Sequence, residues 1–177
     1  MIFIVISGPE SSGKSTLAKY LTSYFKINKS EEYARNYVEQ LDRKYEFADV
    51  ETIAKRQCAS YLIDKRNAEK GDIVIYDTFL IITKVWFEEV YKKCPIWLDK
   101  AIRTYKPNLV LLCYPDLDWQ ADGVRENGDK REILFEKYRQ ELEYYKIDYK
   151  LVKGFGEVRY KNALSIIRNW LKSEEYE

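Results

Sequence analysis

Short apolar runs alternate along the chain with longer stretches in which apolar positions recur every three to four residues. The runs at residues 2–6, 73–76, 109–114 and 149–152 are rich in β-branched and aliphatic residues and predict buried strands, and residues 26–30 predict a weaker fifth. Strands that alternate with helical patterns and lack hairpin turns favour a parallel sheet covered on both faces. We therefore expect an α/β domain of three layers with about five parallel strands.

The helical patterns lie between these runs. Leu17, Tyr20, Leu21 and Tyr24 form the apolar stripe of the first helix. A long helix is expected over residues 50–70, with Asp49 as its N-cap and Gly71 as its C′ residue. Further helices are expected over residues 80–91, from Pro95 to near Tyr105, around residues 134–145 and over residues 158–172.

Composition narrows the range of functions. The 177 residues carry 30 basic and 29 acidic side chains, a net charge of +1. The chain therefore lacks the excess of basic residues that is typical of nucleic-acid-binding proteins. The complete absence of histidine excludes histidine-based acid–base catalysis and histidine metal sites, and three well-separated cysteines suggest neither disulfides nor zinc. The first apolar run is too short for a signal peptide or membrane span. We expect one cytoplasmic domain over residues 1–177 that binds no membrane.

The strongest motif is the segment Gly-Pro-Glu-Ser-Ser-Gly-Lys-Ser-Thr at residues 8–16, which fits G-x-x-x-x-G-K-[ST] between a strand and a helix. In such a P-loop, backbone amides and the helix N-terminus surround the phosphates of a nucleoside triphosphate. Lys14 is expected to reach the β- and γ-phosphates, and Ser15 to ligate Mg²⁺. The expected ATP-binding residues are Gly8, Glu10, Ser11, Ser12, Gly13, Lys14, Ser15 and Thr16.

Asp77 follows the second buried run, at the edge of the sheet where the P-loop also begins. There it would hold Mg²⁺ through water or accept a proton; its alternative role is to cap the helix that starts at Leu80. The chain has no N-K-x-D element after a later strand, which argues against a GTPase, and its length argues against a motor or AAA-type ATPase.

A polar loop over residues 122–131 precedes the next helical pattern and carries Arg125 and Arg131. Kinases of small molecules close an arginine-bearing lid over the phosphates to exclude water, so a lid is expected over about residues 116–146. An ordinary solvated loop would have a similar composition.

Four segments together resemble the ribosylnicotinamide kinase domain of NadR-type proteins: residues 8–16, Glu-Tyr-Ala-Arg-Asn-Tyr at 32–37, Gln57 with Asp77-Thr78, and Trp-Gln-Ala-Asp-Gly-Val-Arg at 119–125. This resemblance implies a P-loop NTPase with strand order 2-3-1-4-5 and a helical lid. It also implies Mg²⁺- and ATP-dependent phosphorylation of nicotinamide riboside to nicotinamide mononucleotide. The chain departs from the family pattern at Phe79, where a second acidic residue is common, and at Asp118, where proline is common.

The resemblance and the residue chemistry suggest an acceptor site made of Glu32, Arg35, Gln57, Trp119 and Asp122. The Gln57 amide suits a carboxamide, and Trp119 among acidic residues suits a pyridinium cation; each could instead serve packing or solvation. The candidate catalytic residues are Lys14, Asp77, Glu32, Arg125 and Arg131, with Asp77 and Glu32 competing as the general base. Another nucleoside kinase, such as one for deoxynucleosides, and a regulatory P-loop ATPase are the alternative functions.

Overall fold

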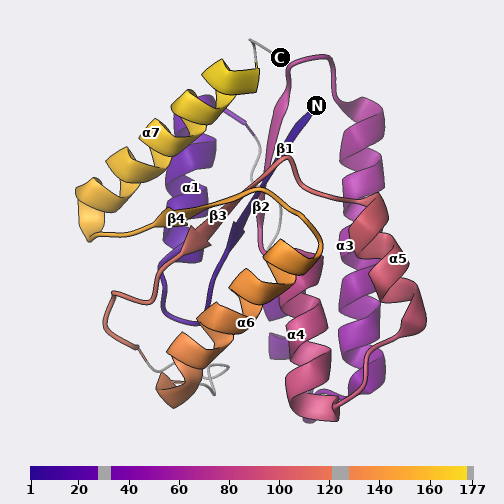
Figure 1. The fold of residues 1–177 in the computed structure, drawn as a ribbon. Helices are drawn as coiled ribbons and strands as arrows, with labels where there is room; N and C mark the ends of the chain where they lie inside the picture. The colour runs from indigo at the N-terminus through magenta and orange to yellow at the C-terminus, as the bar shows by residue number, and fades with distance from the viewer. Residues whose placement is uncertain (28–32, 121–127, 175–177) are drawn as a thin grey trace.

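The structure, a computed structural model, describes residues 1–27, 33–120 and 128–174. Its sheet contains four parallel strands within these residues, in the order β2-β1-β3-β4. Their bounds are Ile2–Ser7 for β1, Ile73–Asp77 for β2, Leu109–Cys113 for β3 and Tyr149–Val152 for β4. The P-loop therefore leaves a central strand, β1, with β2 and β3 on either side of it (Figure 1).

Helices cover both faces of the sheet, which gives three layers (Figure 1). One face carries α1 (Lys14–Phe25) and α7 (Gly156–Glu174). The other carries α3 (Phe47–Asn67), α4 (Leu80–Tyr91), α5 (Ile96–Thr104) and α6 (Arg131–Tyr144), which is preceded by a short 3₁₀ turn at Gly128–Lys130. The short helix α2 (Tyr33–Glu39) contacts α3.

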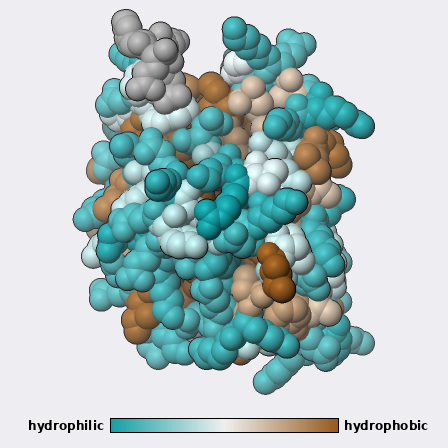
Figure 2. All heavy atoms as spheres, turned by 45° about the vertical axis from the view of Figure 1, so that its right-hand side comes forward, coloured by the Kyte–Doolittle hydropathy of each residue, from teal (hydrophilic) through white to brown (hydrophobic). Residues whose placement is uncertain are grey.

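The alternation of side chains along β1 explains this arrangement. Phe3 and Val5 pack among the residues of α3 to α6, whereas Ile4 and Ile6 pack against α1 and α7. All four are at most 3% exposed, because successive side chains of a strand point to opposite faces and both faces are covered. Outside, the molecular face bearing α3 and α5 is mainly hydrophilic, with apolar side chains in small separate groups (Figure 2).

The parallel α/β architecture is confirmed, and the number of strands is corrected. Four strands rather than five occur in the described part of the chain. Lys26 is the left-handed C-cap of α1 (φ 55°), and residues 28–30 of the expected strand lie outside the described residues. The four strands keep the relative order expected for the second to fifth positions of the sheet.

The long helix begins and ends earlier than predicted. Its N-cap is Glu46, and Asp49 occupies the third helical position of a capping box, where its carboxylate accepts from the Glu46 N–H at 2.6 Å. The helix ends at Asn67 with Ala68 as C-cap, so Gly71 (φ +94°) belongs to the turn before β2. Sequence reasoning missed the start because Phe47 and Ala48 precede the regular apolar stripe.

The region expected to form a lid, residues 116–146, divides into parts. Residues 121–127 lie outside the described residues. The following helix, α6, contacts α4 and buries Leu134, Phe135 and Leu142 in the core. No helix in the described part of the chain is long and apolar enough to span a membrane.

Candidate active site

A cavity of about 480 Å³ lies at the carboxyl end of β1 and β2. It is lined by the P-loop, helix α2, one face of α4, and side chains of α3 and α6, together with Tyr45 and Thr78 from the connecting segments. This is where an open parallel sheet binds its ligands, because the loops after neighbouring strands diverge there. The lining includes all eight residues expected to bind ATP: Gly8, Glu10, Ser11, Ser12, Gly13, Lys14, Ser15 and Thr16.

The P-loop fits tightly against β3. A Cβ atom on Gly8 (φ +141°) would lie 2.7 Å from the Cys113 carbonyl oxygen, so only glycine fits this close approach. Within the loop, the Pro9 carbonyl accepts from Ser12 Oγ at 2.8 Å and from Lys14 Nζ at 2.7 Å. The loop is thus curled around the Pro9 carbonyl. Gly13 adopts the left-handed region (φ +75°) immediately before α1.

Asp77 ends β2 directly beside Ile6 of β1. Its side chain is buried, and neither carboxylate oxygen has a hydrogen-bond partner. The N-cap of α4 is Phe79, and no side chain caps that helix, so the capping role of Asp77 is excluded. A buried carboxylate without partners is costly and indicates a ligand that supplies them.

Several charges converge at this edge of the sheet. Burial raises the pKa of the Cys113 thiol to about 11; Arg159 and Lys14 act to lower it, and Asp77 acts to raise it. The charges of Arg159, Lys14 and Asp77 therefore all act on a thiol at the end of β3. For Mg²⁺, a hard cation that prefers oxygen ligands, the Asp77 carboxylate and the Ser15 hydroxyl are a suitable donor set. Clusters of three or more His, Cys, Asp and Glu residues that could hold a metal ion are absent from the described residues.

Helix α2 forms another wall, through Ala34, Arg35 and Val38. None of its residues is fully buried, so its own packing holds it weakly. Arg35 Nε donates to Glu39 Oε1 one turn later, at 3.0 Å. Arg35, a predicted acceptor-site residue, therefore does line the cavity, whereas Glu32 and Asp122 lie outside the described residues.

A pair of aromatic rings forms the wall of the cavity beyond the P-loop. Tyr45 and Trp86 meet edge to face with their centroids 4.9 Å apart. Beside them, Gln57 Oε1 accepts from Thr83 Oγ1 at 2.9 Å, and both side chains are buried. Gln57, a predicted acceptor-site residue, therefore lines the cavity, and its amide oxygen already accepts a hydrogen bond from Thr83.

Sequence reasoning missed Trp86 and Glu89. Thr83, Trp86 and Val90 recur at helical spacing on the face of α4 that lines the cavity, and α4 begins just after Asp77. That spacing could have indicated a helix face lining the site, but it is equally typical of a face that packs in the core. Glu89 forms an ion pair with Lys137 of α6, which lowers the Glu89 pKa and ties α6 to this wall.

Trp119, Arg131 and Asp77 are not among the residues that line the cavity, although Thr78, next to Asp77, is. Trp119 is 40% exposed. Arg131 Nη2 donates to the carbonyls of Pro115 and Leu117, at 3.0 and 2.6 Å, so this guanidinium supports the loop after β3. Arg125 lies outside the described residues.

Comparison with known proteins places the chain in a family. Residues 3–159 match the profile of a family described as an AAA domain. The chain belongs to this family. The match covers 157 of the 177 residues.

Two curated relatives carry the same name, trifunctional NAD biosynthesis/regulator protein NadR. The Salmonella typhimurium protein is 27% identical over 131 residues, 71% of this chain and 31% of NadR. The Escherichia coli protein is 27% identical over 139 residues, which are 73% of this chain and 33% of NadR. This AAA-domain chain thus spans about a third of the length of these relatives. The resemblance to NadR-type proteins that the sequence suggested is confirmed.

Solved structures agree on the fold. A NadR protein in complex with NR superposes with a TM-score of 0.80 at 23% identity, covering 96% of this chain and 51% of that one. A NadR complex with NAD and AMP-PNP gives 0.74 at 21% identity, covering 96% and 49%. Thymidylate kinase from Ehrlichia chaffeensis gives 0.60 at 14% identity, covering 94% and 97%. The α/β P-loop fold is therefore shared with kinases.

Proposed function

We propose that this chain is an ATP-dependent nucleoside kinase and that its acceptor is nicotinamide riboside, phosphorylated on the 5′-hydroxyl to nicotinamide mononucleotide. The observation that carries the proposal is the single cavity of about 480 Å³ that joins a complete P-loop to a pocket with aromatic and amide walls. Phosphoryl transfer needs donor and acceptor in one water-excluding space. The NadR relatives and the complex of NadR with NR support the choice of acceptor.

The donor half consists of the P-loop and Asp77. Backbone amides of the loop and Lys14 bind the phosphates, and the chain's oxygen ligands for Mg²⁺ are Ser15 and Asp77. Bound Mg²⁺ would neutralise charge that develops on the transferred phosphoryl group. We expect the adenine near residues 154–160, which follow β4 beside the P-loop.

The acceptor half consists of Tyr45, Trp86 and Gln57. Nicotinamide riboside carries a cationic pyridinium ring, which aromatic faces attract. The Gln57 amide suits the carboxamide of that ring because Thr83 already holds its oxygen, which leaves the amide nitrogen as donor. The proton of the 5′-hydroxyl goes to a carboxylate, for which Asp77 and Glu32 are the two candidates.

The test is a coupled ADP-release assay over a panel of nucleosides, with the product identified by mass spectrometry. Nicotinamide riboside, thymidine, deoxycytidine and adenosine cover the competing acceptors. The proposal expects kcat/KM for nicotinamide riboside to exceed every other value by roughly tenfold or more, a difference of about 1.4 kcal/mol. A higher value for a deoxynucleoside would assign another nucleoside kinase. ATP turnover unaffected by any nucleoside would assign a regulatory ATPase.

A further inference from the structure

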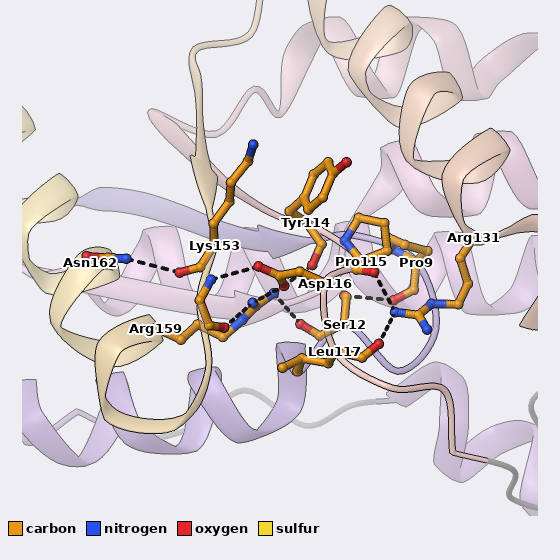
Figure 3. A network of polar contacts seen from close by, with 11 residues as sticks. Pro9, Ser12, Tyr114, Pro115, Asp116, Leu117, Arg131, Lys153, Arg159 and Asn162 are labelled. Atoms are coloured by element: carbon orange, nitrogen blue, oxygen red, sulfur yellow. Dashed lines mark hydrogen bonds and ion pairs between the residues drawn. The ribbon is translucent and has the colours of Figure 1, made fainter.

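Arg159, in the first turns of α7, lies beneath the P-loop, 147 residues from it in sequence. Its side chain is 3% exposed. One terminal nitrogen, Nη2, donates to the carbonyl of Ser12 at 2.7 Å and to that of Tyr114 at 2.9 Å. Figure 3 shows this guanidinium between the P-loop, the end of β3 and the turn that precedes α7.

The second terminal nitrogen of the guanidinium, Nη1, also has two hydrogen-bond acceptors. Nη1 donates to Asp116 Oδ1 at 2.6 Å and to the Gly154 carbonyl at 2.8 Å, while Asp116 Oδ2 accepts from the Gly154 N–H at 2.7 Å. Asp116 supplies the opposite charge without which a buried guanidinium is costly. A planar donor fork with five N–H groups reaches all these acceptors at once; a lysine ammonium does not.

The bond to Ser12 determines a direction within the P-loop. In a trans peptide, the carbonyl of one residue and the N–H of the next point in opposite directions. With the Ser12 carbonyl held by Arg159, the Gly13 N–H points away from Arg159. Gly13 lines the cavity, whereas Arg159 does not. A Cβ atom added to Gly13 would lie 3.6 Å from Arg159 Nε, so the Arg159 side chain occupies the space next to this glycine.

We propose that Arg159 is a positioning residue for phosphate binding. By holding the Ser12 carbonyl, it aims the Gly13 N–H into the cavity, where that N–H donates to a phosphate oxygen of the nucleotide. The inference rests on the proposed ATP-binding role of the P-loop, and it is independent of which nucleoside accepts the phosphoryl group. It also couples the P-loop to the Gly154 turn, because one guanidinium binds both.

The test is Arg159→Lys, with binding of ATP and of inorganic tripolyphosphate measured by calorimetry in the presence of Mg²⁺. Loss of one aligned hydrogen bond to a charged group weakens binding by roughly 10- to 100-fold. The proposal expects a loss of that size for both probes, because tripolyphosphate lacks adenine and reports on the phosphate site alone. KM for ATP should rise accordingly while KM for the nucleoside stays within about twofold.

The matched control is Asn162→Ala. Asn162 also lies on α7 and donates to the Lys153 carbonyl beside the same turn, at 3.1 Å, and it is not among the residues that line the cavity. It should retain wild-type affinity for tripolyphosphate. Should Arg159→Lys fail to fold, the double variant Arg159→Met with Asp116→Asn replaces it, because that pair leaves no unpaired buried charge.

Three outcomes would overturn the inference. They are wild-type tripolyphosphate affinity in folded Arg159→Lys, equal rises in KM for ATP and nucleoside, and an equal loss in Asn162→Ala. A wild-type protein that binds no tripolyphosphate overturns it together with the proposed function. A wild-type protein that binds tripolyphosphate but does not phosphorylate nicotinamide riboside overturns only the proposed acceptor.

Discussion

The Asp49 carboxylate accepts hydrogen bonds from both terminal nitrogens of the Arg43 guanidinium, at 2.7 and 3.0 Å. The same carboxylate accepts from Tyr37 of α2 at 3.0 Å and from the Glu46 N–H. One buried side chain in the first turn of α3 therefore fastens α2 and the segment that follows it. These bonds, that from Arg43 above all, hold the Asp49 pKa well below its usual value.

Asp49→Asn should release α2 from α3. Because α2 forms a wall of the cavity, we expect KM for the nucleoside to rise several-fold while KM for ATP changes little. Steady-state kinetics with each substrate varied in turn measures both constants. The control is Asp42→Asn, an exposed carboxylate seven residues away, which should change neither. Equal changes in the two constants would contradict this role for α2.

The same carboxylate predicts a pH dependence of stability. A group with a lowered folded-state pKa stabilises the protein above its unfolded-state pKa, about 4 for aspartate, and this contribution is lost as the pH falls below that value. The free energy of unfolding of the wild type should exceed that of Asp49→Asn at pH 7, and the gap should narrow steadily on acidification below about pH 4. Urea unfolding of both proteins over this range tests the expectation; a gap that widens in acid would contradict it.

Lys14→Ala should abolish phosphoryl transfer with the fold intact. The ammonium contacts the Pro9 carbonyl within the P-loop and contributes no apolar packing to the core. Removal of a charge that stabilises the transferring phosphoryl group lowers kcat by roughly 100-fold or more. Lys19→Ala, an exposed position on α1, is the matched control. Turnover within tenfold of wild type in folded Lys14→Ala would refute the P-loop assignment.

Asp77→Asn should lower activity and raise stability. The carboxylate is buried without hydrogen-bond partners, so its neutral isostere avoids part of a desolvation cost of about 1–3 kcal/mol. We expect the melting temperature to rise by roughly 2–4 °C for each kcal/mol recovered, and kcat to fall steeply. Asp64→Ala is the comparison: it removes the hydrogen-bond acceptor of the Tyr76 hydroxyl, so it should lower the melting temperature and leave kcat unchanged. A less stable but fully active Asp77→Asn would assign a structural role.

Trp86→Leu should weaken nicotinamide riboside binding selectively. A cation over an indole contributes about 0.5–2 kcal/mol, which corresponds to a rise in KM of roughly 2- to 30-fold. The dihydro form of the riboside has a neutral ring and should lose less. Trp119→Leu is the matched control, because Trp119 is exposed and does not line the cavity. A larger loss in Trp119→Leu than in Trp86→Leu would restore the acceptor role that the sequence suggested for Trp119.

The sequence alone determined the parts of the protein that depend on near neighbours in the chain. The β-branched runs predicted the four described strands, and the bounds of α4 were predicted to the residue. All eight P-loop residues that the motif predicted line the cavity, because consecutive positions of one loop stay together in any fold that forms the loop. The position of Asp77 followed from the rule that parallel strands end at one edge.

The tertiary structure decided what depends on contacts between distant segments. Trp86 and Arg159 sit on helices whose residue patterns are compatible with ordinary packing, and only the assembled sheet brings them to the cavity and beneath the P-loop. Trp119 shows the reverse: an aromatic residue among acidic neighbours suggested a ligand, yet Trp119 is 40% exposed and does not line the cavity. Local sequence specifies backbone geometry and periodicity, whereas the partner of a side chain is chosen by the packing of elements that can be more than a hundred residues apart.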